Sequence, residues 1–241
     1  MQTVFSIATD ALAYGMVLFV ISIGLSVTMG LMRVVNLAHG AFAMIGGYIA
    51  SYAVRDLGLA YGFAVLLAVV ATILIAIPIE RLLYRRIYGA PELTQVLMTI
   101  GITFCVIGIA NYVFGPTLKT IPLPEHLRGP VDLGFRSIAA HKLFAIGCGG
   151  PVALALWYLI ERTSFAVRLR GSLDKAAMAA ALGVRTQMVY AASFAVAVGL
   201  AALGGVIGAE LLPIEPYYAL RYMVTFLVVV SVGGAGSIPG A

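Results

Sequence analysis

Residues 34–49, VVNLAHGAFAMIGGYI, place polar side chains and clustered glycines inside a long apolar stretch rather than at its ends. If the stretch is helical, its small and polar residues share about 120° of the helix circumference. These residues are Asn36, His39, Gly40, Ala43, Gly46, Gly47 and Ala50. The larger apolar side chains lie opposite and suit lipid. The small face admits either a solute or a second helix backbone, so the stretch by itself favours neither a translocation path nor a packing face.

The composition indicates that this stretch lies in a membrane. Of the 241 residues, 62% are hydrophobic and only 10% are charged, whereas a soluble domain carries about 25% charged residues. The charged residues divide the chain into uncharged runs of about the length that a membrane-spanning helix needs. These runs are residues 11–32, 34–54, 57–79, 93–118, 143–160, 186–209 and 222–241. The sequence therefore predicts an all-α polytopic helical bundle, with about seven to eight transmembrane spans in a single domain over residues 1–241.

The basic residues predict how the bundle is oriented. If the first span runs inward, the whole net charge of +5 falls on one side of the membrane. That side receives Arg33, Arg81, Arg85, Arg86, Arg162, Arg168, Arg170, Lys175 and Arg185 together with Glu80, Glu92, Glu161 and Asp174, while the remaining charged residues cancel. The positive-inside rule makes this side cytoplasmic and places the N-terminus outside. The basic balance follows from this topology and gives no reason to expect a nucleic-acid partner.

Three of the predicted spans carry further patterns. The third, residues 61–79, is expected to end near Pro78 and to be followed by an arginine- and tyrosine-rich inner loop over residues 80–93. The next span has Gln95, Thr99 and Thr103 on one face, and these side chains either bond to their own helix or form a polar seam beside residues 34–49. The span over residues 187–209 repeats small residues every four positions, which predicts close packing against another helix.

Two loops are candidates for contact with partners. The outer segment, residues 115–142, is rich in proline and is either a plain linker or a docking rim for an extracytoplasmic partner. In the cytoplasmic loop, residues 161–186, Ser172 is expected to cap a short helix over residues 175–182 that ends at Gly183. This alanine-rich helix suits a groove on another protein, although it could also pack on the protein's own spans.

Several kinds of chemistry have no basis in the sequence. The histidines at 39, 126 and 141 are scattered, Cys105 and Cys148 lie in different apolar runs, and no metal or other cofactor is expected. There is no phosphate-binding lysine motif and no catalytic triad or HExxH pattern. All acidic residues are predicted to lie at span ends or in loops, which disfavours an ion-coupled carrier. The remaining interpretation is a path for a solute that has no energy source of its own, so that a bound partner must supply the energy for transport.

Four segments resemble the permease subunits of ABC importers for branched-chain amino acids. They are VVNLAHGAFAMIGGYIA (34–50), IERLLYRRIYGAPEL with MTIGITF (79–93 and 98–104), ERTSFAVRLRG with AAMAAALGV (161–171 and 176–184), and VGGAGSIPGA (232–241). The resemblance implies a second related permease subunit, cytoplasmic ATP-binding subunits and a periplasmic substrate-binding protein, all in the bacterial inner membrane. It implies that ATP is hydrolysed by these partners and not by this chain.

The resemblance also implies roles for particular residues. Asn36, His39 and Gly40 are expected at the pathway or gate, with Thr99 and Gly101 on the neighbouring helix. Ala43, Gly46 and Gly47 are expected there as well, because they share the small face with these residues. The ATPase-coupling helix is expected to include Asp174, Ala177, Ala180, Leu182 and Gly183. Alanine replaces the glutamate of the general coupling motif, and family members usually continue past GSIPGA, so the chain is expected to be C-terminally short.

Other functions stay open at this point. The same machine could carry urea or short amides, and the chain could be a structural membrane subunit or a passive channel.

The charge distribution places Asn36 and His39 near the inner mouth, where they would act as gate or helix-start groups, with Ala43, Gly46 and Gly47 leaving room further out.

Overall fold

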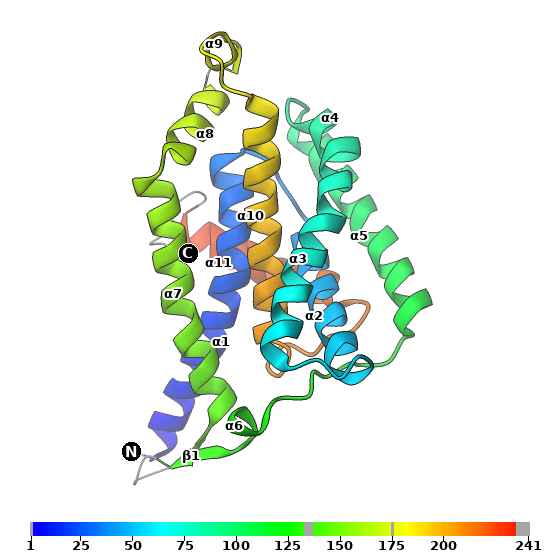
Figure 1. The fold of residues 1–241 in the computed structure, drawn as a ribbon, viewed down its shortest axis with the longest axis vertical. Helices are drawn as coiled ribbons and strands as arrows, with labels where there is room; N and C mark the ends of the chain where they lie inside the picture. Colours follow the sequence, from blue (N-terminus) through cyan, green and yellow to red (C-terminus); the bar gives the residue numbers. More distant parts are fainter. Residues whose placement is uncertain (1, 133–136, 175, 235–241) are drawn as a thin grey trace.

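The computed structural model describes residues 2–132, 137–174 and 176–234 and shows a bundle of long helices (Figure 1). The elements in chain order are α1 (Gln2–Ser26), η1 (Val27–Leu31), α2 (His39–Arg55), α3 (Tyr61–Ile79), η2 (Glu80–Tyr84), α4 (Arg85–Ile87), α5 (Glu92–Phe114), α6 (Glu125–Arg128), β1 (Pro130–Asp132), β2 (Ser137–Ala139), α7 (Ala140–Arg162), α8 (Ser164–Asp174), α9 (Ala176–Ala181), α10 (Thr186–Ile207) and α11 (Tyr218–Gly233). The η elements are π-helical turns that continue α1 and α3.

Five helices in the described part of the chain are long and apolar enough to cross a membrane. They are Val4–Gly30, Tyr61–Ile87, Glu92–Phe114, Ala140–Arg162 and Thr186–Ile207. The 17-residue α2 and the 16-residue α11 are shorter and at about 1.5 Å per residue cover only part of a bilayer core. The predicted all-helical membrane bundle is confirmed, while the number of seven to eight spans and the outside N-terminus stay predictions.

Helix α10 forms the centre of the bundle, with α1, α2 and α3 packed around it. Its glycines permit this approach: a Cβ on Gly205 would overlap the carbonyl oxygen of Ala43 in α2, and one on Gly204 would overlap Ile21 in α1. The close packing predicted for this helix from its small residues is confirmed. In contrast, α5 touches mainly α2 and α11 and stands at the edge of the bundle in Figure 1.

Helix α2 begins five residues later than the apolar pattern predicts. Residues 33–38 are non-helical and run back from the end of η1 into the bundle. Arg33 starts this segment with φ +53°, a left-handed conformation that reverses the chain. The expectation of one helix over residues 34–49 is therefore wrong at its start, and Asn36 does not lie on the helix that carries His39.

The helix of the third span does not end at Pro78. It continues through η2 and α4 to Ile87, so the predicted inner loop begins only at Tyr88. Proline removes one backbone hydrogen bond, but a membrane helix tolerates this where a local change to a π turn and neighbouring helices satisfy the freed groups. The continuation buries Glu80, whose carboxylate accepts a hydrogen bond from the Tyr88 hydroxyl at 2.8 Å. Glu80 thus lies inside a helix rather than in a loop.

The two loop regions lie at opposite ends of the bundle (Figure 1). At one end, α6 and the antiparallel pair of β1 and β2 follow a long connector that is tied to the α10–α11 loop through the Lys119–Ile214 bridge. At the other end, α8 lies beside the start of α10 and α9 projects beyond it. Ser172 lies inside α8, so the expectation that it caps the next helix is wrong, whereas the predicted end at Gly183, with φ +82°, is confirmed.

Candidate functional site

The backbone of residues 33–38 is held by side chains of α5. The amide of Val35 donates to Gln95 Oε1 at 2.9 Å, and the amide of Leu37 donates to Thr99 Oγ1 at 3.2 Å. Gln95 in turn donates to the carbonyl oxygens of Ile87 and Ala90. Non-helical backbone inside a membrane bundle is stable only where its polar groups find such partners. Gln95 and Thr99 therefore form a polar seam that stabilises a break in the helices rather than joining two regular ones. Thr103 follows the other alternative, because its hydroxyl donates to the Thr99 carbonyl of its own helix.

Asn36 lies fully buried within this break. Its Oδ1 accepts hydrogen bonds from the Tyr84 hydroxyl at 2.7 Å and from the Ala38 amide at 3.1 Å. Two donors on one atom identify that atom as the oxygen and fix the orientation of the amide. The Nδ2 group has no hydrogen-bond partner within the described residues.

His39, the first residue of α2, is also buried. Its Nε2 lies 2.8 Å from the carbonyl oxygen of Ile21, so Nε2 carries the proton and Nδ1 is the acceptor of the neutral ring. Within the part of the chain that the structure describes, Nδ1 has no partner. A Cβ on Gly24 would lie 2.9 Å from the imidazole Cε1, which shows how closely the ring packs against α1.

The depth of His39 differs from the sequence-based expectation. Gly24, which contacts the imidazole, also faces the carbonyl oxygen of Ala197, and Ala197 is near the middle of α10. The predicted place of His39 near the inner mouth is therefore wrong. Asn36 lies closer to that end, because its partner Tyr84 belongs to the extension of α3. The reason is that residues 33–38 run from the end of η1 into the middle of the bundle without forming a helix, and α2 begins only there.

A cavity of about 10 Å³ lies beside the start of α2. It is lined by Leu25, Asn36, Leu37, His39, Gly40, Met223, Phe226 and Leu227. Helix α11 covers it, and a Cβ on Gly40 would lie 3.2 Å from Ala219 Cα and 3.3 Å from Phe226 Cε2. A volume of this size is at the lower limit for one water molecule, so the site is closed in this conformation.

The remaining predicted pathway residues do not join this cavity. A Cβ on Gly46 would lie 2.6 Å from Ala202 Cα of α10, and Ala43 faces Gly205 of the same helix. Gly47 faces Ile214. In this conformation Ala43 and Gly46 pack against α10 and Gly47 against the α10–α11 loop, which is the packing alternative. Thr99 is buried at the break, whereas Gly101 is exposed on α5 with open space around it.

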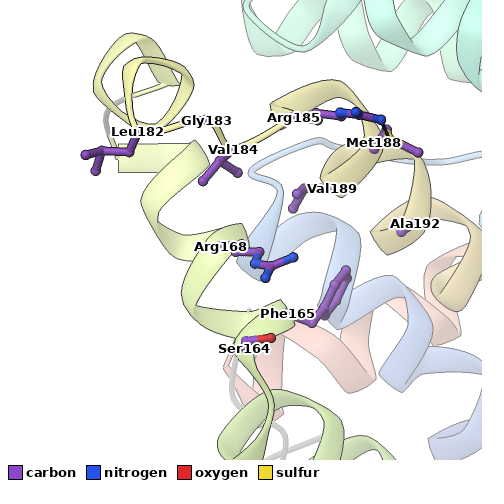
Figure 2. A pocket seen from close by; sticks show the side chains of 10 residues that line it. All are labelled: Ser164, Phe165, Arg168, Leu182, Gly183, Val184, Arg185, Met188, Val189 and Ala192. Carbon is purple, nitrogen blue, oxygen red and sulfur yellow. Dashed lines mark hydrogen bonds between the residues drawn. The ribbon is translucent and has the colours of Figure 1, made fainter.

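A second candidate site lies at the end of the bundle formed by α8, α9 and the start of α10. A pocket of about 560 Å³ opens there, and Figure 2 shows Phe165 and Arg168 of α8 projecting towards Val189 of α10, with Leu182 turned outward. The exposed apolar side chains at this end, here called the α8–α9 surface, are Val167, Met178, Leu182 and Met188. Leu182 is 80% exposed. Ala180 and Gly183 are exposed as well. The side chains of Asp174 and Ala177 lie outside the described residues.

The α8–α9 surface is connected to the centre of the bundle. The Tyr190 hydroxyl of α10 donates to the backbone carbonyl of Ser172 at 2.9 Å, and Leu169 is buried between the helices. Helix α10 packs against α2 and carries Ala197 beside Gly24 and His39. Helix α10 thus connects the α8–α9 surface with the residues beside the helix break.

Sequence reasoning did not identify Tyr84, Met223 and Phe226 as parts of the site. Tyr84 falls in the arginine- and tyrosine-rich segment that the sequence predicts to be an inner loop, because its helix is expected to end near Pro78. Met223 and Phe226 lie on a short apolar helix with no local polar signal, so only their contact with α2 reveals them. The sequence places Gln95 and Thr99 on one face of their helix. Only the tertiary structure shows that they accept hydrogen bonds from the amides of Val35 and Leu37.

Comparison with known proteins gives consistent similarities. A family model described as "Branched-chain amino acid transport system / permease component" matches residues 7–241. The chain is 28% identical over 236 residues to the high-affinity branched-chain amino acid transport system permease protein LivH of Escherichia coli strain K12, a match that covers 92% of this chain and 76% of the relative. It is 27% identical over 247 residues to the corresponding protein BraD of Pseudomonas aeruginosa, with 96% and 80% covered. No solved structure matches the chain.

Proposed function

Because the chain belongs to the family of permease components of branched-chain amino acid transport systems, we propose that it is the membrane-spanning subunit of an ATP-driven importer of leucine, isoleucine or valine. It is a multi-pass membrane protein. Its relatives LivH and BraD are named as high-affinity permeases for these amino acids. The proposal places the chain in the bacterial inner membrane, with a second permease subunit, cytoplasmic ATP-binding subunits and a periplasmic substrate-binding protein as partners.

The observation that carries this proposal is the buried break at residues 33–38. Burying polar backbone away from water costs free energy unless it is satisfied, so a break held by three side chains is an unusual feature for a purely structural subunit. In membrane transporters, discontinuous helices provide polar groups at the depth where a solute must pass. Asn36, His39, Gly40 and Thr99 are accordingly the pathway residues in this proposal. Ala43 and Gly46 pack α2 against α10, and Gly47 packs it against Ile214 of the following loop.

The energy for transport enters at the α8–α9 surface in this proposal. Exposed Met178 on α9 and exposed Leu182 in the turn that follows it suit an apolar groove of an ATP-binding subunit. Tyr190 then links α8 to α10, and α10 reaches the break. ATP binding and hydrolysis by the partner would thus rearrange the helices that surround His39. No ATP-binding role falls to this chain.

Uptake of labelled leucine tests the proposal. In cells that express this chain with its partner subunits, uptake is expected to vanish when the ATP-binding subunit is deleted or made unable to hydrolyse ATP. Uptake that persists with only a proton gradient contradicts the ATP-driven mechanism. Uptake of urea or acetamide in place of leucine contradicts the assigned cargo and leaves the machine intact.

A further inference from the structure

The pocket of about 560 Å³ between α8 and the start of α10 carries only positive charge among the described residues that line it. Arg168 belongs to α8, and Arg185 directly precedes α10. Within the described part of the chain neither guanidinium has a carboxylate partner, and Arg185 Nη1 lies against Met188 Sδ at 3.8 Å. The volume falls in the range of about 300–1,000 Å³ that small-molecule sites occupy. The pocket therefore has the charge and the size for an anionic ligand.

The pocket lies at the level where two membrane spans end. The span Ala140–Arg162 stops two residues before Ser164, which lines the pocket, and the span Thr186–Ile207 begins directly after Arg185. The ends of spans lie at the level of the phospholipid headgroups. The charge distribution predicts that this end is cytoplasmic, and basic pockets between helices on the cytoplasmic side bind anionic headgroups. The position thus favours a ligand that belongs to the membrane.

The remaining wall of the pocket is apolar and continues into the span. Phe165 projects towards Val189 (Figure 2). Met188 and Ala192 are exposed on α10 beside them. Ala192 follows Thr186 by six residues, which is about 9 Å along the span at 1.5 Å per residue. A phospholipid acyl chain reaches this depth, whereas a side chain of a cytoplasmic protein does not.

We propose that this pocket binds an anionic phospholipid, with its phosphate at Arg168 and Arg185 and an acyl chain along Met188 and Ala192. A guanidinium donates parallel hydrogen bonds to phosphate oxygens, so two arginines suit a phosphodiester. The lipid would join α8 to α10 in addition to the hydrogen bond from the Tyr190 hydroxyl to the carbonyl of residue 172. The site goes beyond the proposed function, because it depends on neither the cargo nor the energy source.

The proposed lipid site differs from the part of α9 that is proposed to contact an ATP-binding subunit. Met178 does not line the pocket, and the side chain of Leu182 turns outward from it in Figure 2. Binding of a lipid is therefore compatible with docking at α9. An acidic side chain of the ATP-binding subunit is the competing occupant of the pocket, and it would leave the apolar wall at Ala192 uncovered.

Lipid titration of the purified chain in an uncharged detergent tests the site. Phosphatidylglycerol, or phosphatidylcholine with the same acyl chains, is added in rising amounts, and the unfolding temperature is measured. Phosphatidylglycerol is expected to act at a concentration about tenfold lower, because its headgroup lacks the choline cation that the arginines repel. Glycerol 3-phosphate, which has no acyl chains, is expected to leave the unfolding temperature unchanged at the same concentrations.

Variants at exposed positions separate the pocket from the general charge of this end. Arg168→Gln and Arg185→Gln are each expected to raise the phosphatidylglycerol concentration at half-maximal shift about tenfold, because one charge-assisted contact is lost. Ala192→Trp keeps both charges but fills the apolar wall, and it is expected to weaken binding as well. The matched control is Arg86→Gln on α4, at the same end of the bundle but outside the pocket, which is expected to have no effect.

Three outcomes overturn the lipid site. They are equal titrations with the two phospholipids, a shift with glycerol 3-phosphate as large as with phosphatidylglycerol, and an Arg86→Gln effect as large as that of the pocket variants. Pocket variants that keep the lipid titration but no longer co-purify the ATP-binding subunit also overturn it, because the arginines then bind that subunit. If a variant fails to fold, the comparison of the three ligands on the wild-type protein still decides.

Discussion

Asn36 shows how one side chain can hold together a broken helix. Its carbonyl oxygen joins Tyr84 from the extension of α3 to the backbone of Ala38. Gln95 and Thr99 satisfy the neighbouring amides. Each bond replaces one that a regular helix would have made, so the break is stable only while these side chains are present.

Gln95→Leu is expected to destabilise the protein. The substitution leaves the Val35 amide and the Ala90 carbonyl oxygen without partners, while the Ile87 carbonyl keeps the Ala90 amide. Each buried group left unpartnered costs about 1–3 kcal/mol. Thermal unfolding in detergent would show a lowered transition temperature. Asn111→Leu on the same helix is the control, since Asn111 bonds only to the carbonyl of Ile107 in its own helix. Equal effects of both substitutions contradict the role of Gln95 at the break.

Gly205→Ala tests the contact between α10 and α2. A methyl group at this position would overlap the Ala43 carbonyl oxygen, so the helices must separate, at a cost of about 1–3 kcal/mol. We expect a lower unfolding temperature and a lower yield of assembled complex. Gly108→Ala on α5 meets open space and is expected to leave both unchanged. An unaffected Gly205→Ala protein would show that this contact contributes little.

At the scale of elements, α8 and α9 are short helices whose sequence favours contact with a partner. Their exposed apolar residues lie at an end of the bundle where the charge pattern predicts the cytoplasm, and α10 supports them through Tyr190. Helix α11 has the contrasting role of a cover: it is short, and it packs on α1, α2 and the edge of α5.

Leu182→Asp is expected to weaken association with the ATP-binding subunit. The side chain is 80% exposed, so a charge there has little effect on the fold of this chain but is costly in an apolar groove. Co-purification would show the loss of the ATP-binding subunit. Leu118→Asp, at an exposed apolar residue of the outer connector, is the control. Retained association of the Leu182 variant would place the docking site elsewhere.

At the scale of the whole molecule, the charged ends and the apolar flanks agree with a membrane orientation. Exposed apolar side chains cover α3 and α5, for example Leu66 and Leu97, as expected for helices that face lipid or another permease subunit. The basic loops gather at the α8–α9 end, and the β1–β2 pair lies at the other end.

Cysteine labelling in intact cells tests the predicted orientation. In a protein with Cys105 and Cys148 replaced, a single cysteine at Val131 in β1 is expected to react with a membrane-impermeant maleimide. One at Leu182 is expected to react only after the cells are broken open. Both positions are exposed, so accessibility differs only through the membrane. The reverse pattern would place the N-terminus inside.

The sequence by itself determined the class of the protein, because composition, charge-free runs and loop charges are local or additive properties. It also located the end of α9 at Gly183, where a positive φ favours glycine, and the close packing of α10. The resemblance of four segments to a permease family was confirmed by the family match over residues 7–241.

Only the tertiary structure decided where α2 begins, how far α3 continues and what fills the small face of α2. The partners of residues 35–37 come from Tyr84, Gln95 and Thr99, far along the chain, and an apolar pattern carries no information about such bonds. Ala43 and Gly46 are as suitable for a solute as for a helix, and the backbone of α10 occupies that space. Periodicity determines which residues share a face, whereas the choice of neighbour depends on packing of the whole bundle.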